Sequence, residues 1–320
     1  RCTQPLLDST RKKISMFSNV TSTDVFSCHD VPSIFSVPQI LYEQGIVDKI
    51  FTKFNKVGMI NSAANWDKWN NIVNSMQNKD GEIKIAMVGK YVTLTDSYVS
   101  VNHALKHAAA KIGKSVSIDW IDSEEINGKV NDLVKYNGIL VPGGFGSRGA
   151  EGIIKTANFA REKNIPYLGI CFGFQLAAVA FGRHVLNYSD ANSTELDPKT
   201  SHPVVDLLPE QKTVSNMGGS LRLGAHDITI KPSTIAYKAY NASHVFRRHR
   251  HRYEINTKYL PEFEKHGLVF SAESDNSKRM EMLEIPSHKF YFGVQFHPEF
   301  NSRPGFPEES FEAFIQASAS

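Results

Sequence analysis

Cysteine is scarce in this sequence, which has three in 320 residues, at Cys2, Cys28 and Cys171. An odd and sparse set without a recognisable secretory leader excludes the disulfide framework of a small secreted protein. Such a set is typical of proteins from a reducing compartment. We therefore expect a cytoplasmic protein whose thiols are free.

Long apolar runs and an excess of one charge are also missing. The longest apolar run, residues 176–181, falls far short of the roughly 20 residues that cross a bilayer. The 36 basic and 33 acidic residues leave a formal charge of +3, far from the basic balance of a domain that neutralises nucleic-acid phosphates. We therefore expect neither a membrane nor a nucleic acid as the partner.

The first 50 residues contain too few apolar positions to bury a core of their own. We expect a helix over 5–17, a strand over 24–27 and a helix over 37–43. Because the chain starts with Arg1 rather than methionine, we expect residues 1–50 to be the end of a larger domain.

Two further regions follow along the chain. Residues 51–80 are rich in Asn and Lys, and they fit a linker that carries one helix over 66–76. A compact domain is expected over residues 81–320.

Buried-type strands alternate with amphipathic helices in this domain. The expected strands are 83–88, 116–120, 138–141 and 166–170, and the expected helices are 97–112, 151–163 and 172–181. The alternation predicts an α/β fold, a mostly parallel central sheet flanked by helices on both faces. Short strands near Ile228, Leu268, Met282 and Phe292 are expected to extend that sheet with antiparallel additions.

A Gly-x-Cys-x-Gly turn centred on Cys171 joins the expected strand 166–170 to the following helix. Glycines two positions on either side of a nucleophile allow backbone and helix to approach closely around it, and a helix N-terminus favours an anion such as a thiolate. A cysteine taken at random is more often a small buried apolar residue. The flanking glycines at a strand-to-helix turn instead favour a nucleophile.

A histidine and a carboxylate follow a second apolar strand, in the segment His297-Pro298-Glu299. Cysteine catalysis requires an imidazole to accept the thiol proton and a third group to hold its tautomer. The same segment, taken alone, is equally compatible with a strand end and a turn. Together with the cysteine turn, it predicts a base and its orienting group.

Glycines also follow the strand 138–141, in Pro142-Gly-Gly-Phe-Gly146. The simplest interpretation is a tight turn between a strand and a helix. Alternatively, the amides of Gly144 and Phe172 form an oxyanion hole. A phosphate-binding loop is less favoured, because the pattern Gly-x-x-x-x-Gly-Lys-Ser/Thr occurs nowhere in the sequence.

The ordered set Pro-Gly-Gly, Gly-x-Cys-x-Gly and His-Pro-Glu resembles the class I glutamine amidotransferases, which have a flavodoxin-like three-layer fold and a Cys-His-Glu triad. Longer stretches, spread over nearly the whole chain, are similar to the CTP synthase family. They are Lys13-Ile-Ser-Met-Phe17, His29-Asp-Val31, Val88-Gly-Lys-Tyr91, Asp190-Ala-Asn-Ser-Thr-Glu195, Met217-Gly-Gly219, Leu221-Arg-Leu-Gly224 and Arg248-His-Arg-His-Arg-Tyr253.

The resemblance implies a glutaminase that releases ammonia through a thioester. In it Cys171 is the nucleophile, His297 the general base and acid, and Glu299 the group that orients His297. This step needs no cofactor and no metal.

Four further positions match those that hold L-glutamine in the family: Gly143, Gln175, Glu195 and Arg250. A carboxylate such as Glu195 suits the α-ammonium group, and a guanidinium such as Arg250 suits the α-carboxylate. One departure is at Phe172 and Phe174, where members of the family usually have Leu and Met.

The complete family enzyme uses the ammonia, with Mg²⁺ and ATP, to convert UTP to CTP, and it forms homotetramers and filaments. By resemblance, Arg148 lies in a lid where GTP is an allosteric activator, and Arg1, Asp30 and Val31 lie near the ATP adenine. Because most of the synthetase domain is missing here, we expect only the glutaminase step from this chain.

Three alternatives stay open. One is a γ-glutamyl hydrolase of the same fold, which the synthetase-like opening disfavours. A second is a noncatalytic assembly or regulatory module. The third is nucleic-acid binding through residues 247–252, which are more often a solvated basic face.

Overall fold

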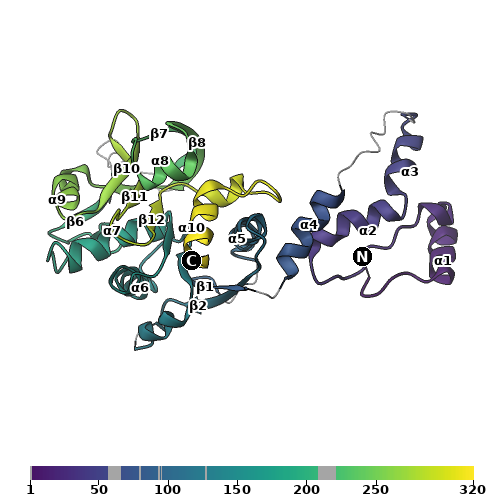
Figure 1. Ribbon diagram of the computed structural model, residues 1–320, viewed down its shortest axis with the longest axis horizontal. Coiled ribbons are helices and arrows are strands. Elements are labelled where there is room, and N and C mark those ends of the chain that lie inside the picture. Colours follow the sequence, from purple (N-terminus) through teal and green to yellow (C-terminus); the bar gives the residue numbers. More distant parts are fainter. Residues whose placement is uncertain are drawn as a thin grey trace. The chain divides into compact units, whose positions relative to one another are not determined.

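The computed structural model describes residues 2–56, 66–78, 81–92, 94, 96–126, 128–207 and 221–320 (Figure 1). Arg1 and the Met217-Gly-Gly219 stretch of the sequence comparison lie outside these residues. The chain divides into two compact units, residues 1–77 and 78–320. Each unit is described by itself.

The smaller unit is built from short helices. They are α1 (Asp8–Ser18), α2 (Val37–Glu43), α3 (Ile46–Lys53) and α4 (Trp66–Gln77), with 3-10 turns at Ser22–Asp24 and Ile34–Ser36. Large apolar side chains of this unit are exposed, among them Leu7, Met16 and Phe17. Such exposure is expected of a segment that is too short to bury its own core.

The predicted strand over 24–27 is wrong. Ser27 is held by a side chain instead of a neighbouring strand, because Gln44 Oε1 accepts its N–H at 2.7 Å and Gln44 Nε2 donates to its carbonyl at 2.9 Å. A side-chain amide that offers both a donor and an acceptor substitutes for a strand partner. The nearest backbone pairing is an isolated bridge between Cys2 and His29.

The larger unit contains a nine-stranded sheet with the order β2-β1-β3-β4-β12-β11-β10-β7-β8. The strands β2, β1, β3, β4 and β12 are parallel, and the pairs from β12 to β8 are antiparallel. This confirms the predicted α/β fold with antiparallel additions. The bounds are β1 Ile83–Gly89, β2 Val116–Asp122, β3 Gly138–Val141, β4 Tyr167–Ile170, β7 Arg222–Ile230, β8 His244–His251, β10 Val269–Ser274, β11 Arg279–Glu284 and β12 Tyr291–Val294.

Helices cover both faces of this sheet and give three layers (Figure 1). The side chains of β1 alternate between the faces: Ala86 and Val88 join the core under α6 and α7, while Ile85 and Met87 join the core under α5 and α10. The helices are α5 Val99–Lys111, α6 Ala150–Lys163, α7 Phe172–His184, α8 Ile235–Tyr240, α9 Leu260–Lys265 and α10 Glu309–Ala319.

A smaller sheet stands beside the main one in the fold. It contains β5 (Asn192–Ser193), β6 (Pro203–Leu207) and β9 (Tyr253–Ile255). The segment that begins with β5 carries Glu195, and β9 follows β8, which carries Arg250. The small sheet therefore fixes the chain on both sides of two predicted substrate-binding residues.

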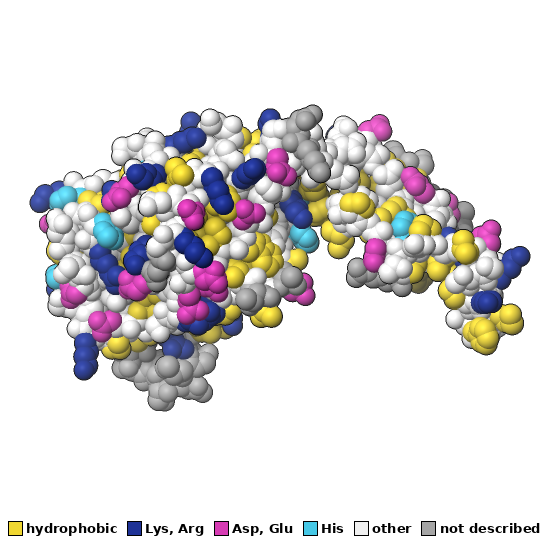
Figure 2. Space-filling view, turned by 90° about the horizontal axis from the view of Figure 1, so that it is seen from below, with side chains coloured by type: hydrophobic (Ala, Val, Ile, Leu, Met, Phe, Trp, Pro, Cys, Tyr) yellow, Lys and Arg dark blue, Asp and Glu magenta, His cyan; other side chains and the backbone are white. Residues whose placement is uncertain are grey.

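The surface of the larger unit mixes both signs of charge. Figure 2 shows Lys and Arg side chains interspersed with Asp and Glu on the visible face of that unit. None of the helices among the described residues has the length and apolar character to cross a membrane.

Candidate active site

Cys171 occupies a strained turn between β4 and α7. Its backbone has φ 52° and ψ −96°, a conformation that residues other than glycine rarely adopt. Its N–H donates to the Val294 carbonyl at 2.7 Å, which ties the turn to β12. The neighbouring glycines are required by space: a methyl group at Gly173 would lie 2.4 Å from the Val141 carbonyl oxygen, and one at Gly169 would lie 2.7 Å from the Gly173 backbone.

The thiol of Cys171 is buried, with 2% of the residue exposed. Its Sγ lies 3.8 Å from the carbonyl oxygen of Arg250 and 3.7 Å from the amide nitrogen Nε2 of Gln295. The sulfur therefore has one acceptor and one donor close by. It also stands at the N-terminus of α7, where the first N–H groups have no partner within the helix.

His297 and Glu299 form an ion pair beside this thiol. Nδ1 of His297 lies 2.9 Å from Oε1 of Glu299, and the His297 backbone N–H donates to the Arg248 carbonyl at 2.8 Å. A methyl group at Gly143 would lie 3.0 Å from His297 Cε1 and 3.7 Å from Cys171 Cβ. The imidazole ring and the cysteine side chain therefore both lie next to Gly143.

Burial lowers the pKa of the His297 imidazole, but the interactions with Cys171 and Glu299 outweigh it and raise that pKa to about 10. The imidazolium is therefore the favoured form at neutral pH. Its Nε2 atom is buried and has no other hydrogen-bond partner within the described part of the chain. That nitrogen is available to the thiol or to a leaving amine.

The imidazole of His297 is expected to stay protonated from about pH 6 to about pH 9. We predict that its NMR Cε1–H signal, assigned with His297→Asn, titrates near pH 10 in the parent chain. Removing the carboxylate charge in Glu299→Gln should lower the midpoint by about one to two pH units.

The exposed Glu162→Gln should leave the midpoint unchanged. A parent signal that titrates near the ordinary value of 6.5 would contradict the ion pair.

A buried lysine holds the glycine loop that follows β3. Nζ of Lys90 donates to the Phe145 carbonyl at 2.9 Å and to the Gly146 carbonyl, and it lies 4.0 Å from the centre of the Phe172 ring. Burial lowers the pKa of this ammonium to about 8. No role was predicted for Lys90 from the sequence, although this residue directly follows the parallel strand β1, a position where site residues collect.

One cleft of about 670 Å³ brings most of the predicted site residues together. Six of them line it: Gly143, Gly144, Cys171, Arg250, His297 and Glu299. The rim adds aromatic residues, including Tyr91 and Phe300. Residues that follow the parallel strands β3, β4 and β12 thus face one space together with Arg250 of β8. The carboxyl edge of a parallel sheet is where such a site is expected.

The remaining predicted residues lie around this cleft rather than in its lining. Glu195 accepts the N–H of Gly146 at 2.7 Å, so it contacts the glycine loop. Gln175 is buried behind Cys171, with its Nε2 donating to the Tyr253 carbonyl at 2.8 Å and to Gln295 Oε1 at 3.1 Å. Phe172 contributes the first residue of α7.

The Arg148 side chain is held by hydrogen bonds to neighbouring residues instead of pointing to open space. Its guanidinium donates to Glu124 at 2.8 Å and to the Lys90 carbonyl at 2.7 Å. The side chains of Arg148 and Glu124 are both about half exposed. Arg148 therefore would have to exchange the Glu124 pair before it could bind a nucleotide phosphate.

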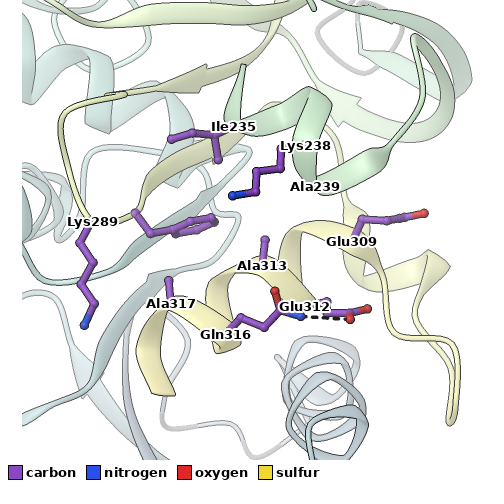
Figure 3. A pocket seen from close by; sticks show the side chains of 10 residues that line it. Ile235, Lys238, Ala239, Lys289, Glu309, Glu312, Ala313, Gln316 and Ala317 are labelled. Carbon is purple, nitrogen blue, oxygen red and sulfur yellow. Dashed lines mark hydrogen bonds between the residues drawn. The ribbon is translucent and has the colours of Figure 1, made fainter. Parts of the chain in front are cut away.

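Another hollow, of about 510 Å³, lies between α8 and α10 (Figure 3). Its lining mixes Lys238 and Lys289 with Glu309 and Glu312, and it includes no cysteine or histidine. It therefore offers neither a thiol nor an imidazole. Among the described residues, no group of three or more His, Cys, Asp or Glu side chains is placed to hold a metal ion.

Comparison with known families matches two parts of this chain. Residues 93–317 match the model of glutamine amidotransferase class-I, and residues 1–56 match the model of the CTP synthase N-terminus. The first match includes every residue that lines the cleft and carries a predicted role.

Similar curated proteins are CTP synthases from archaea and bacteria. The protein from Archaeoglobus fulgidus is 47% identical over 317 residues, 99% of this chain and 59% of that protein. The protein from Staphylococcus carnosus is 44% identical over 317 residues, 98% of this chain and 58% of that protein. The chain thus spans less than two thirds of these relatives.

A solved structure extends the likeness to the fold. It is the glutaminase domain of Trypanosoma brucei CTPS with bound acivicin, 39% identical to this chain, with a TM-score of 0.70. The match covers 74% of this chain and 94% of that domain. The chain therefore belongs to the CTP synthase family and carries its class I glutamine amidotransferase domain.

Proposed function

We propose that this chain hydrolyses the side-chain amide of L-glutamine and releases ammonia, with Cys171 as the nucleophile. The observation that carries the proposal is the cleft itself. The buried thiol stands at a helix N-terminus, and the ion pair of His297 and Glu299 lies beside it. A thiolate next to an imidazolium is the reactive form of a cysteine nucleophile.

The reaction begins when the Cys171 thiolate attacks the side-chain carbonyl carbon of glutamine. The carbonyl π electrons move to oxygen and give a tetrahedral oxyanion. His297 then donates its proton to the amide nitrogen, the C–N bond breaks, ammonia leaves and a thioester remains. Water, deprotonated by His297, attacks the thioester, which releases glutamate and returns the thiolate.

The oxyanion is assigned to the N–H groups of Gly144 and Phe172. Phe172 is the first residue of α7, and the first N–H groups of a helix are free to bind an anion. Gly144 lies in the loop that Lys90 holds through the next two carbonyls. Fixed donors of this kind stabilise charge as it develops, without reorganising at the moment of reaction.

The two charged ends of the substrate are assigned to two residues. The exposed side chain of Arg250 lines the cleft and suits the α-carboxylate, to which it would bind in a bidentate manner. Glu195 contacts the glycine loop at Gly146 and suits the α-ammonium. Gly143 borders the thiol, and Gln175 supports the wall behind it.

Replacing Glu195 with glutamine is expected to weaken glutamine binding. The variant keeps the shape and the acceptor for the Gly146 N–H but loses the charge that faces the α-ammonium. We predict that KM for L-glutamine rises about tenfold while kcat changes little. Steady-state ammonia release measures both.

The matched control is Glu162→Gln, on the outer surface of α6, which should keep the parent KM. An unchanged KM in Glu195→Gln would remove this residue from the substrate site.

In the complete protein, the ammonia would serve the amination of UTP to CTP. We propose that residues 1–50 are the end of the synthetase domain, that 51–80 link it onward and that 81–320 form the glutaminase domain. ATP and Mg²⁺ belong to the synthetase reaction, with GTP as activator.

Ammonia release from L-glutamine tests the proposal. Purified chain should release ammonia from L-glutamine but not from D-glutamine, whose α-groups would exchange places relative to Glu195 and Arg250. Absence of release from both, in a folded chain, would count against a self-contained glutaminase.

A further inference from the structure

Two buried side-chain amides form a row directly behind the thiol. Gln175 on α7 and Gln295 after β12 are 3% and 0% exposed. Nε2 of Gln175 donates to Oε1 of Gln295 at 3.1 Å, and Nε2 of Gln295 lies 3.7 Å from Cys171 Sγ. The row therefore ends on the sulfur.

A backbone carbonyl fixes the direction of both amides. Gln175 Nε2 also donates to the Tyr253 carbonyl at 2.8 Å, and a carbonyl oxygen is an acceptor only. Gln175 must therefore turn its NH₂ group toward Tyr253 and Gln295. Gln295 must in turn present its oxygen to Gln175, which leaves its NH₂ group facing the sulfur.

The two sides of Sγ consequently favour different charge states. A neutral thiol can donate its proton to the Arg250 carbonyl, 3.8 Å away. A thiolate cannot donate, but it accepts from the Gln295 NH₂ group. A hydrogen bond to an ionised acceptor is stronger than one between neutral groups, so the Gln295 contact favours the thiolate.

Gln295 and His297 reach the thiol from one segment. They stand two residues apart in the bend that follows β12, and the side chains of both interact with Cys171. The Gln295 backbone N–H donates to the Glu281 carbonyl at 2.8 Å, which fixes its position. One segment thus delivers both an N–H donor and an imidazole to the sulfur.

We propose that Gln295 is a catalytic residue that stabilises the Cys171 thiolate through its side-chain N–H, and that Gln175 positions it. This inference deepens the proposed glutaminase function and rests on it. It adds a positioning role to the substrate contact predicted for Gln175, because the amide nitrogen of Gln175 donates to Tyr253 and Gln295.

Alkylation by iodoacetamide tests the thiolate directly and does not depend on turnover. The rate at the Cys171 peptide is followed by mass spectrometry from about pH 5 to about pH 9, with the Cys28 peptide as an internal reference. The variants are Gln295→Met, which keeps the length but removes the N–H, and Gln175→Met, which releases the orientation of Gln295. The control is Gln316→Met, on the exposed side of α10.

We expect alkylation of Cys171 near pH 6.5 to fall about tenfold in Gln295→Met and about threefold in Gln175→Met. The rise of the rate with pH should move to higher pH in both variants. Cys28 and Gln316→Met should match the parent. A loss of packing alone would expose Cys171 and speed its alkylation, so the direction separates the two explanations.

Parent-like rates and pH profiles in folded Gln295→Met would overturn the inference. If that variant does not fold, Gln175→Met decides in the same way. Ammonia release is measured in the same samples. If the parent chain releases no ammonia but its alkylation at Cys171 still depends on Gln295, the inference is supported and the proposed function is contradicted. If the parent is active, and Gln295→Met is as active and is alkylated as fast as the parent, the role of Gln295 is contradicted while the proposed glutaminase function stands.

Discussion

Cys171→Ala is expected to abolish ammonia release from L-glutamine, with a loss of at least about a thousandfold in kcat. In the proposed mechanism, the variant removes the sulfur that forms the thioester and keeps the proposed oxyanion donors and substrate contacts. Alanine adopts the φ 52° backbone at the same cost as cysteine, so the fold should persist. Ammonia release under saturating glutamine, with circular dichroism for folding, measures the effect.

The other two cysteines are the matched controls. Cys2→Ala and Cys28→Ala change half-buried thiols of the smaller unit, whereas the cleft lies in the larger unit. Both should retain the parent kcat. Residual activity above about a tenth of the parent rate in folded Cys171→Ala would exclude covalent catalysis at this cysteine.

Gly173→Ala is expected to destabilise the larger unit by about 3 kcal/mol or more. Its methyl group would lie 2.4 Å from the Val141 carbonyl oxygen and 2.9 Å from a Val141 side-chain carbon. Neither β3 nor α7 can yield without moving the Cys171 turn. Thermal unfolding should therefore show a midpoint lower by roughly 6–12 °C, together with a loss of ammonia release.

The control for this substitution lies on the same helix. In Gly182→Ala the nearest atom is the Ala191 methyl carbon at 3.1 Å, a contact that small shifts relieve. The gain in helix propensity, about 1 kcal/mol, should leave the midpoint close to that of the parent. Equal midpoints for Gly173→Ala and the parent would mean that α7 does not press on β3 as described.

The parallel half of the sheet was predictable because its strands and helices carry regular patterns. The helices predicted over 97–112, 151–163 and 172–181 correspond to α5, α6 and α7 with ends that differ by a few residues. The strands predicted over 83–88 and 138–141 correspond to β1 and β3. Buried apolar runs and the 3.6-residue period survive in a fold with two covered faces.

Other elements carry no such pattern. β8 (His244–His251) is a run of basic residues in which the buried positions are Arg247, His249 and His251. Burial of these side chains is possible because carboxylates pair with them. For example, Nε2 of His249 lies 2.8 Å from Oε2 of Glu281. A sequence shows the charges of such a strand but not the partners that make burial acceptable.

The candidate site also contains residues that a sequence pattern marks and residues that only the fold brings there. Cys171, His297 and the glycine loop were predictable because glycine spacing and strand ends mark them. Lys90 and Gln295 were not assigned roles, since a single lysine or glutamine has no signature until the fold brings it to the sulfur or to the loop. Gln175 was assigned to the substrate, and its contacts with Tyr253 and Gln295 became visible only in three dimensions.

The most direct test of the proposed nucleophile is covalent labelling by a glutamine-mimicking diazoketone, followed by peptide mass spectrometry. One adduct is predicted, on Cys171, and excess L-glutamine should prevent it while D-glutamine does not. Cys2 and Cys28 should remain unmodified. Labelling that is spread over the three cysteines, or that L-glutamine does not slow, would contradict a glutamine site at Cys171.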